Sequence, residues 1–340
     1  MKKFEEVQRS LIEEPKSWLI TGVSGFIGSN LLEQLLKLNQ RVIGLDNFST
    51  GKESNLLEVE NIVSSKQWKN FSFIEGDITN PLIYERNVLS NVDYVLHQAA
   101  LGSVPRSISD PIATNNANID GFLNLIEASR KEKVKKFIYA SSSSVYGDEE
   151  SLPKKEEIIG NPLSPYAVSK LTNELYAKAY AQNYKFSSIG LRYFNVYGKR
   201  QDPYGSYAAV IPKWTLSMLK DEEIKIYGDG NTSRDFCFID NVVQMNILAA
   251  TSSINGSQVF NVALGNRISL NELYDLIKQA LIDLGKEVKS LPIYTDFRDG
   301  DVRHSQADIS KAKEVLDYSP EVSIKEGIPR SVEWYINNLN

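Results

Sequence analysis

Apolar residues follow two different spacings between residues 18 and 192. Residues 18–20 form a continuous apolar run typical of a buried strand, whereas from Leu31 to Leu38 the leucines recur at the spacing of one helix face. Strands that alternate with helices predict an α/β fold built on a parallel, doubly wound sheet. Further apolar runs, separated by helical stretches, occupy residues 41–46, 71–77, 94–97, 137–141 and 187–192.

The regular alternation weakens after residue 195. Short apolar segments at 223–227 and 259–263 are followed by an amphipathic helix over 270–284. This change predicts a second, smaller α/β lobe that is partly interleaved with the first domain. The predicted division is a larger domain over residues 1–194, to which 240–267 returns, and a smaller lobe over 195–340.

Composition narrows the classes of function that this chain can have. The 340 residues carry a formal net charge of -5, which argues against a nucleic-acid or membrane surface but leaves room for a local basic pocket. One cysteine, Cys237, and two histidines, His97 and His304, cannot assemble the usual transition-metal site, so we expect no metal. The lone thiol and the lack of a signal sequence or an eighteen-residue apolar run predict a cytoplasmic protein.

Three glycines follow the first apolar run at a spacing that suits a bound dinucleotide. Gly22 permits a tight turn, Gly25 permits close backbone approach to a pyrophosphate, and Gly28 permits close packing of the following helix. Three glycines in eight residues also occur in ordinary loops. The strand before them and the helix after them favour the nucleotide site, which is the Rossmann arrangement.

Two aspartates stand at the ends of predicted strands. A carboxylate at Asp46 can accept hydrogen bonds from ribose hydroxyls and repels the 2′-phosphate of NADP, so it favours NAD as the cofactor. A cap or turn role is the alternative for Asp46. For Asp77, a turn role and contact with adenine remain equally open.

Tyr166 and Lys170 lie four positions apart in a helical stretch, hence on one helix face. A nearby ammonium group and a nicotinamide cation both favour the phenolate of a tyrosine, which makes it usable as a base. Serines at 141–144 follow a predicted parallel strand, where open α/β sheets gather ligand groups. Taken alone, a half-buried tyrosine beside a solvated lysine and a serine-rich loop without chemistry are the alternatives. The upstream glycines favour the catalytic interpretation.

Together these residues resemble the extended short-chain dehydrogenase/reductase family, and within it the UDP-sugar 4-epimerases. The segment 192–198 resembles the substrate-entry segment of that family, and the likeness covers nearly the whole chain. Segments 46–51, 102–107 and 298–305 are most similar to bacterial UDP-N-acetylglucosamine 4-epimerases. The residues that match the family pattern in order and spacing are Gly22 to Gly28, Asp46, Ser142, Tyr166 and Lys170.

The resemblance implies roles for individual residues. It implies catalysis by Tyr166, Lys170 and Ser142, and a homodimer formed through helices. It also implies that the larger domain binds NAD and that the smaller α/β lobe is the substrate lobe, which binds the UDP-sugar. The implied NAD-binding residues are Gly22, Gly25, Phe26, Ile27, Gly28, Asp46, Asn47, Ser49, Thr50, Gly51, Asp77, Ile78, Gln98, Ala99, Ala100, Asn118, Tyr166 and Lys170. The implied UDP-sugar-binding residues are Ser103, Ser142, Ser143, Tyr166, Asn195, Ala209, Val210, Tyr227, Arg234, Arg298, Asp301 and Ser305.

Ser143 and Ser144 bear on sister activities of the family. Sugar-nucleotide 4,6-dehydratases typically carry an acidic pair there, and serines are poor substitutes for a general acid and base. We therefore expect a C4 epimerase acting on UDP-N-acetylglucosamine and UDP-N-acetylgalactosamine through a 4-keto sugar, as for polysaccharide biosynthesis. The small Ser305 predicts room for the acetamido group. A UDP-glucose/galactose epimerase, a dehydratase, a decarboxylase and a silent NAD-responsive regulator are the alternatives.

Overall fold

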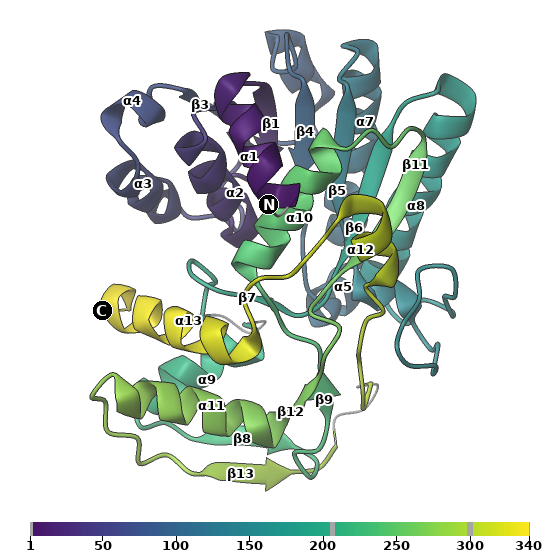
Figure 1. Cartoon of the computed structure of the whole chain (residues 1–340). Helices are drawn as coiled ribbons and strands as arrows, with labels where there is room; N and C mark the ends of the chain where they lie inside the picture. Colours follow the sequence, from purple (N-terminus) through teal and green to yellow (C-terminus); the bar gives the residue numbers. More distant parts are fainter. Residues whose placement is uncertain (1–2, 205–207, 298–301, 340) are drawn as a thin grey trace.

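A seven-stranded sheet forms the centre of the larger part of the molecule (Figure 1). The computed structural model describes residues 3–204, 208–297 and 302–339. The strands run in the order β11-β6-β5-β4-β1-β2-β3 and every neighbouring pair is parallel, which confirms the predicted doubly wound sheet. Their bounds are β1 Ser17–Thr21, β2 Arg41–Asp46, β3 Phe71–Glu75, β4 Tyr94–His97, β5 Lys136–Ser142, β6 Ser188–Tyr193 and β11 Ser257–Val262.

Helices cover both faces of this sheet, and successive side chains of β1 enter different cores. Trp18 and Ile20 join a cluster on the face covered by α2 (Phe26–Lys37) and α10 (Ile239–Thr251). Leu19 points to the opposite face, covered by α7 (Gly121–Lys131) and α8 (Pro165–Tyr184). Because a strand places alternate side chains on opposite faces, a wholly apolar run marks a strand buried on both.

Among the described residues, no helix is both long and apolar enough to cross a membrane.

Shorter helices surround the larger part of the molecule. These shorter elements are α1 Lys3–Glu13, α3 Glu53–Ile62, α4 Ser65–Trp68, the 3₁₀ turn η1 Pro81–Arg86, α5 Val104–Ser109, α6 Pro111–Asn115, the π-helical turn η2 Asn116–Asp120 and the 3₁₀ turn η3 Ser143–Tyr146.

The smaller part packs three helices beside a parallel strand pair (Figure 1). The helices are α9 (Val210–Leu219), α11 (Leu270–Asp283) and α13 (Ile324–Asn338), and the pair joins β8 (Ile224–Tyr227) to β13 (Pro292–Thr295). Between α9 and α11 the chain leaves this part: α10 packs against the large sheet and β11 joins it as a strand. The chain then returns to the smaller part with α11. The remaining elements are β7 Val196–Tyr197, β9 Ser233–Arg234, β10 Cys237–Phe238, β12 Ile268–Ser269 and α12 Ser310–Leu316.

The order of the strands fixes where a ligand can enter. From β1 the chain continues to β2 and β3 on one side and then crosses to β4 on the other side of β1. At such a switch point the loops leave the carboxyl ends of neighbouring strands in opposite directions and open a crevice. The glycines after β1 and the residues after β4 therefore meet at one edge of the sheet.

Candidate functional site

The turn after β1 is too crowded for any side chain at two of its glycines. Gly22 has a φ of +71°, and a Cβ built there would lie 2.7 Å from the backbone nitrogen of Ala99. A Cβ on Gly28 would lie 2.0 Å from the carbonyl oxygen of Gly22. Gly25 is the N-cap of α2, and no side chain caps that helix, so its first-turn N–H groups are left for an anion.

Asp46 holds this turn against the loop that follows β2. Its carboxylate accepts hydrogen bonds from the backbone nitrogens of Ser24 at 2.9 Å and Phe48 at 2.8 Å. The turn role weighed for Asp46 is therefore present, and the same side chain also lines a cleft. Each carboxylate oxygen retains a second acceptor site for a ligand hydroxyl.

Asp77 faces Asn47 across this edge of the sheet, with Asn47 Nδ2 donating to Asp77 Oδ2 at 2.8 Å. Burial acts to raise the pKa of Asp77, but hydrogen bonds from Thr79 and Asn47 outweigh it and lower the pKa below the usual value. The carboxylate is thus kept ionised, as an acceptor.

A cleft of about 340 Å³ opens at this edge, and we name it the glycine cleft. Asn118 does not line it but fixes its wall, because its side chain exchanges hydrogen bonds of 2.8 and 3.1 Å with the backbone of Leu101. Phe26, Ile27 and Gly28 lie in the first turn of α2. The expected residues that line the cleft are Gly22, Gly25, Asp46, Asn47, Ser49, Thr50, Gly51, Asp77, Ile78, Gln98, Ala99 and Ala100.

Sequence reasoning missed six residues of the glycine cleft. Leu45 and Gly76 each directly precede an aspartate that was expected, so strand-end position was the available signal. The other four come from the loop after β4 and from α6 and η2, short elements without a readable periodicity. The six are Leu45, Gly76, Leu101, Ala113, Asn116 and Ala117.

A second, larger cleft of about 960 Å³ lies beyond the ends of β5 and β6, and we name it the tyrosine cleft. Ser142, Ser143, Tyr166, Asn195, Arg234 and Ser305 line it as expected. No acidic side chain is among its described lining residues. The lining residues that sequence reasoning did not assign to a substrate are Val104, Pro105, Ile108, Ser144, Tyr146, Gly147, Lys154, Leu163, Ser164, Ala167, Tyr193 and Val302.

Four expected substrate residues lie elsewhere. Ser103 caps α5, with its side chain accepting from the backbone nitrogen of Arg106, and Tyr227 is exposed on β8. Ala209 is the exposed N-cap of α9, and Val210 begins that helix. Arg298 and Asp301 fall outside the described residues.

Tyr166 and Lys170 stand one turn apart at the start of α8, where Ser164 caps the helix by accepting from the Ala167 nitrogen at 3.1 Å. Lys170 Nζ lies 5.9 Å from the centre of the Tyr166 ring and donates to the Ala140 carbonyl at 2.8 Å. Burial lowers the pKa of Lys170 to about 8. Burial also raises the pKa of Tyr166, against a hydrogen bond with Ser142 that lowers it.

A buried ion pair stands behind the serines. Arg192 donates two hydrogen bonds to Glu174, at 2.9 and 2.7 Å, and Ser141 Oγ donates to the same carboxylate at 2.6 Å. The charge of Arg192 therefore balances that of Glu174 inside the protein, and Glu174 does not line the tyrosine cleft. Ser142 Oγ instead accepts from Ser144 on the cleft side, at 3.1 Å from its nitrogen and 3.0 Å from its hydroxyl.

One tyrosine connects the two clefts. Tyr193 lines the tyrosine cleft, and its hydroxyl donates to Oε1 of Gln98, a residue of the glycine cleft, at 3.1 Å. Asn246 Nδ2 donates to the same hydroxyl at 2.9 Å. The hydroxyl of Tyr193 therefore joins the walls of the two clefts.

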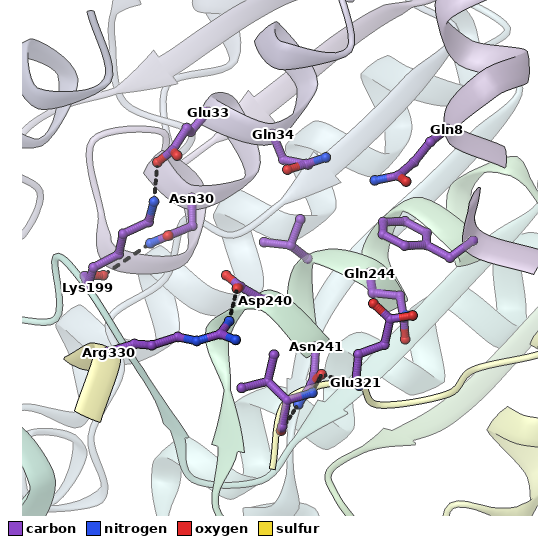
Figure 2. Close-up of a pocket in the computed structure, with 13 residues that line it drawn as sticks. Gln8, Asn30, Glu33, Gln34, Lys199, Asp240, Asn241, Gln244, Glu321 and Arg330 are labelled. Atoms are coloured by element: carbon purple, nitrogen blue, oxygen red, sulfur yellow. Dashed lines mark hydrogen bonds and ion pairs between the residues drawn. The ribbon is translucent and has the colours of Figure 1, made fainter. Parts of the chain in front are cut away.

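A third cleft, of about 320 Å³, lies between α1, α2, α10 and α13, and we name it the α1 cleft (Figure 2). Four of its charged side chains form two ion pairs: Lys199 with Glu33 at 2.6 Å, and Asp240 with Arg330 at 3.6 Å. None of the residues expected from the sequence lines it. We therefore assign no chemistry to it.

Comparison with known proteins shows the family to which this chain belongs. The profile of the "NAD dependent epimerase/dehydratase family" matches residues 18–263. The chain belongs to this family. The predicted family resemblance is thus confirmed, and the family's cofactor is NAD, which solved neighbours also hold.

Several members of the epimerase/dehydratase family resemble the chain over nearly its full length. A UDP-glucose 4-epimerase of Mycolicibacterium smegmatis is 37% identical over 94% of this chain and 98% of its own. A UDP-glucuronate 4-epimerase of Thermodesulfobacterium geofontis is 37% identical over 95% and 97%. The solved UDP-N-acetylglucosamine 4-epimerase of Methanobrevibacter ruminantium, in complex with UDP-N-acetylmuramic acid, is 37% identical with a TM-score of 0.87, over 96% and 99%.

Proposed function

We propose that this member of the family is an NAD-dependent UDP-sugar 4-epimerase that interconverts UDP-N-acetylglucosamine and UDP-N-acetylgalactosamine. The single observation that carries the proposal is the pairing of Tyr166 with a roomy cleft that has serines and no acid among its described lining residues. Relatives of equal identity are named for three different sugars, so overall similarity supports epimerisation and does not select the sugar.

The glycine cleft is suited to NAD. The uncapped start of α2 would face the pyrophosphate, and Asp46 would accept from the adenosine ribose and disfavour the 2′-phosphate of NADP. Crowding at Gly22 and Gly28 shows why no side chain can occupy this approach. Bound NAD would supply the acceptor, and later the donor, of a hydride at C4 of the sugar.

Tyr166 is the residue we propose to remove the proton from the 4-hydroxyl group. Its hydrogen bond with Ser142 offers a path by which the serine shares that proton. Burial disfavours the phenolate, so the tyrosine needs positive charge nearby when it acts. Lys170, on the same face of α8, would supply part of that charge and contact the cofactor ribose.

Inversion at C4 requires the keto sugar to turn over while its nucleotide stays bound. Arg234 and Asn195, which both line the tyrosine cleft, would hold the UDP group, the arginine through charge-assisted hydrogen bonds to phosphate. The cleft of about 960 Å³ leaves space for the hexose to rotate. Rotation within this space would present the other face of the keto sugar to the cofactor, so that the overall reaction would have no net redox change.

The preference for N-acetylated sugars rests on the small side chains around the cleft. Ser142, Ser143, Ser144 and Ser305 leave volume that larger residues would remove. Ser305→Tyr should fill the space for the acetamido group and lower kcat/KM for UDP-N-acetylglucosamine by about a hundredfold, the scale of a pocket that excludes a group sterically.

UDP-glucose provides the matched control for that variant, because it lacks the acetamido group. We expect Ser305→Tyr to retain or raise its turnover of UDP-glucose. Undiminished turnover of the N-acetylated substrate by the variant would contradict the proposed preference.

We further propose that the chain forms a homodimer through α5, α6 and α8, helices that lie against one another. Large apolar side chains are exposed on α6 and α8, including Ile112 at 72%, Leu175 at 60% and Val168 at 45%. Such a patch is typical of a protein interface. Light scattering should give twice the chain mass for the wild type, and Leu175→Glu should shift it toward the monomer; an unchanged mass would contradict this interface.

A further inference from the structure

A fully buried carboxylate, Asp235, lies behind the tyrosine cleft, directly after Arg234. Three backbone N–H groups donate to its side chain: Leu264 to Oδ1 at 3.0 Å, Gly265 to Oδ2 at 3.0 Å and Ala307 to Oδ2 at 3.2 Å. One side chain thus ties together segments of the chain that are far apart in sequence.

The segments joined at Asp235 carry residues that line the tyrosine cleft. The backbone carbonyl of Asp235 accepts from Asn195 Nδ2 at 2.9 Å, and Ala307 follows Ser305 by two positions. The segment that carries Ser305 also pairs with Ser233, the Ser305 nitrogen donating to the Ser233 carbonyl at 3.0 Å. Asn195, Arg234 and Ser305, which come from three different segments, are therefore all positioned around Asp235.

Burial disfavours a charged carboxylate at this position. Burial raises the pKa of Asp235 to about 7, and the hydrogen bonds from Leu264, Ala307 and Gly265 oppose that rise. A buried charge without its hydrogen bonds is strongly disfavoured. An asparagine could accept through only one of its two terminal atoms and would turn its NH₂ group toward at least one donor. The carboxylate is suited to gathering three donors at once.

From this geometry we propose that Asp235 is a positioning residue for nucleotide binding, because it sets the places of Asn195, Arg234 and Ser305 around the substrate. The inference rests on the proposed function, in which these residues contact a UDP-sugar. Asp235 itself lies outside the lining of the cleft and acts through its neighbours.

The test compares Asp235→Asn with the wild-type enzyme in three measurements: UDP affinity by titration calorimetry, kcat and KM for UDP-N-acetylglucosamine, and bound NAD. We expect UDP affinity to fall and KM to rise by about tenfold, the equivalent of about 1.4 kcal/mol. The kcat at saturation should change by less than about threefold, and NAD content should be unchanged. A merely structural role would instead lower stability with KM and UDP affinity preserved.

Asn241 offers a matched control on α10. It is equally buried, and its Oδ1 accepts from the backbone nitrogens of Glu321 at 2.8 Å and Val322 at 3.1 Å beside the α1 cleft (Figure 2). Asn241→Ala should lower the unfolding midpoint while leaving UDP affinity and KM unchanged. A fall in UDP affinity of the same size in this variant would overturn the inference.

Hydrogen exchange in the wild-type chain keeps the inference testable should Asp235→Asn not fold. UDP should slow exchange at the amides of Leu264, Gly265 and Ala307 together. Unchanged exchange at all three would overturn the positioning role. The two proposals also fail differently: no UDP binding by the wild type would contradict the proposed function, whereas equal UDP binding by wild type and Asp235→Asn would contradict only the positioning role.

Discussion

The glycine cleft and the tyrosine cleft are built in opposite ways. Most residues of the glycine cleft follow the ends of β1, β2, β3 and β4, in chain order. The turn after β1 depends on close backbone contacts at Gly22 and Gly28, where a side chain would not fit. The tyrosine cleft gathers segments from Val104 to Ser305, and polar side chains such as Asp235 hold them together.

This difference separates two kinds of requirement. Steric requirements at the glycine cleft are absolute and local, so single substitutions should abolish binding outright. The tyrosine cleft is held together by hydrogen bonds between several segments, so each single substitution there should weaken substrate binding only in part. One exception is Tyr166, which we propose carries the chemistry itself.

The largest effect should come from Tyr166→Phe, which removes the proposed base. We expect kcat to fall by about a thousandfold, within the usual range for a general acid–base group, while NAD remains bound. Tyr176→Phe, on the same helix and outside both clefts, is the control and should keep full activity. A Tyr166→Phe enzyme that retained most of its turnover would show that the chemistry lies elsewhere.

Gly22→Ala should sharpen the steric side of the comparison. Gly22 and Gly256 both have positive φ, +71° and +81°, but a Cβ at Gly256 meets nothing within 4 Å. We expect Gly256→Ala to cost about 1 kcal/mol of unfolding free energy from backbone strain alone. Gly22→Ala should cost about 3 kcal/mol or more and lose NAD, because Ala99 cannot move away without opening the cleft. Denaturant unfolding and the NAD absorbance of the purified variants measure both; equal costs at the two positions would argue against crowding.

His97, the last residue of β4, makes the stability of the folded chain sensitive to acid. It is buried with its Nδ1 2.7 Å from Thr21 Oγ1, and burial, with a smaller contribution from the charge of Lys170, lowers its pKa to about 3. Below pH 6.5 the unfolded chain takes up a proton that the folded chain does not, so stability is complete above that pH and falls as pH drops toward 3. The loss is about 1.4 kcal/mol per pH unit.

Urea unfolding between pH 6.5 and pH 4.5 tests this dependence. His97→Gln should flatten the pH dependence of the unfolding free energy. His304→Gln is the matched control beside the tyrosine cleft, where the histidine is only partly buried and should contribute less. An unchanged slope in His97→Gln would contradict the assignment of a buried neutral imidazole.

The smallest effect should come from Tyr193→Phe, which breaks the contact between the clefts. Gln98 and Asn246 each lose one hydrogen bond, so we expect NAD binding to weaken by about 1 kcal/mol, or about fivefold. UDP affinity should stay within about twofold of the wild type. Calorimetric titration of both ligands would show whether the clefts are instead strongly coupled.

The sequence predicts the residues of the glycine cleft better than those of the tyrosine cleft, because the glycine cleft is built mainly from the ends of consecutive strands. Gly22, Asp46 and Asp77 follow strands whose periodicity is readable, and parallel strands bring their carboxyl ends to one edge. Tyr166 and Lys170 are close because they share one helix.

The remainder depends on contacts between distant segments. Lys154 lines the tyrosine cleft because its backbone pairs with Ala307, and Asp235 has the three amide partners that only the folded chain brings near. No local pattern signals either. The sequence did not predict that Ala113 and Ala117 line the glycine cleft, because α6 and η2 are too short to show a helical period.

The most direct test of the central claim is incubation of the purified protein with UDP-N-acetylglucosamine, without added reductant, followed by separation of the C4 epimers. We predict that UDP-N-acetylgalactosamine accumulates to a constant ratio with no net change in NAD, and that the same ratio is reached from the opposite epimer. No product, or a keto sugar that accumulates instead, would contradict the assignment as a 4-epimerase.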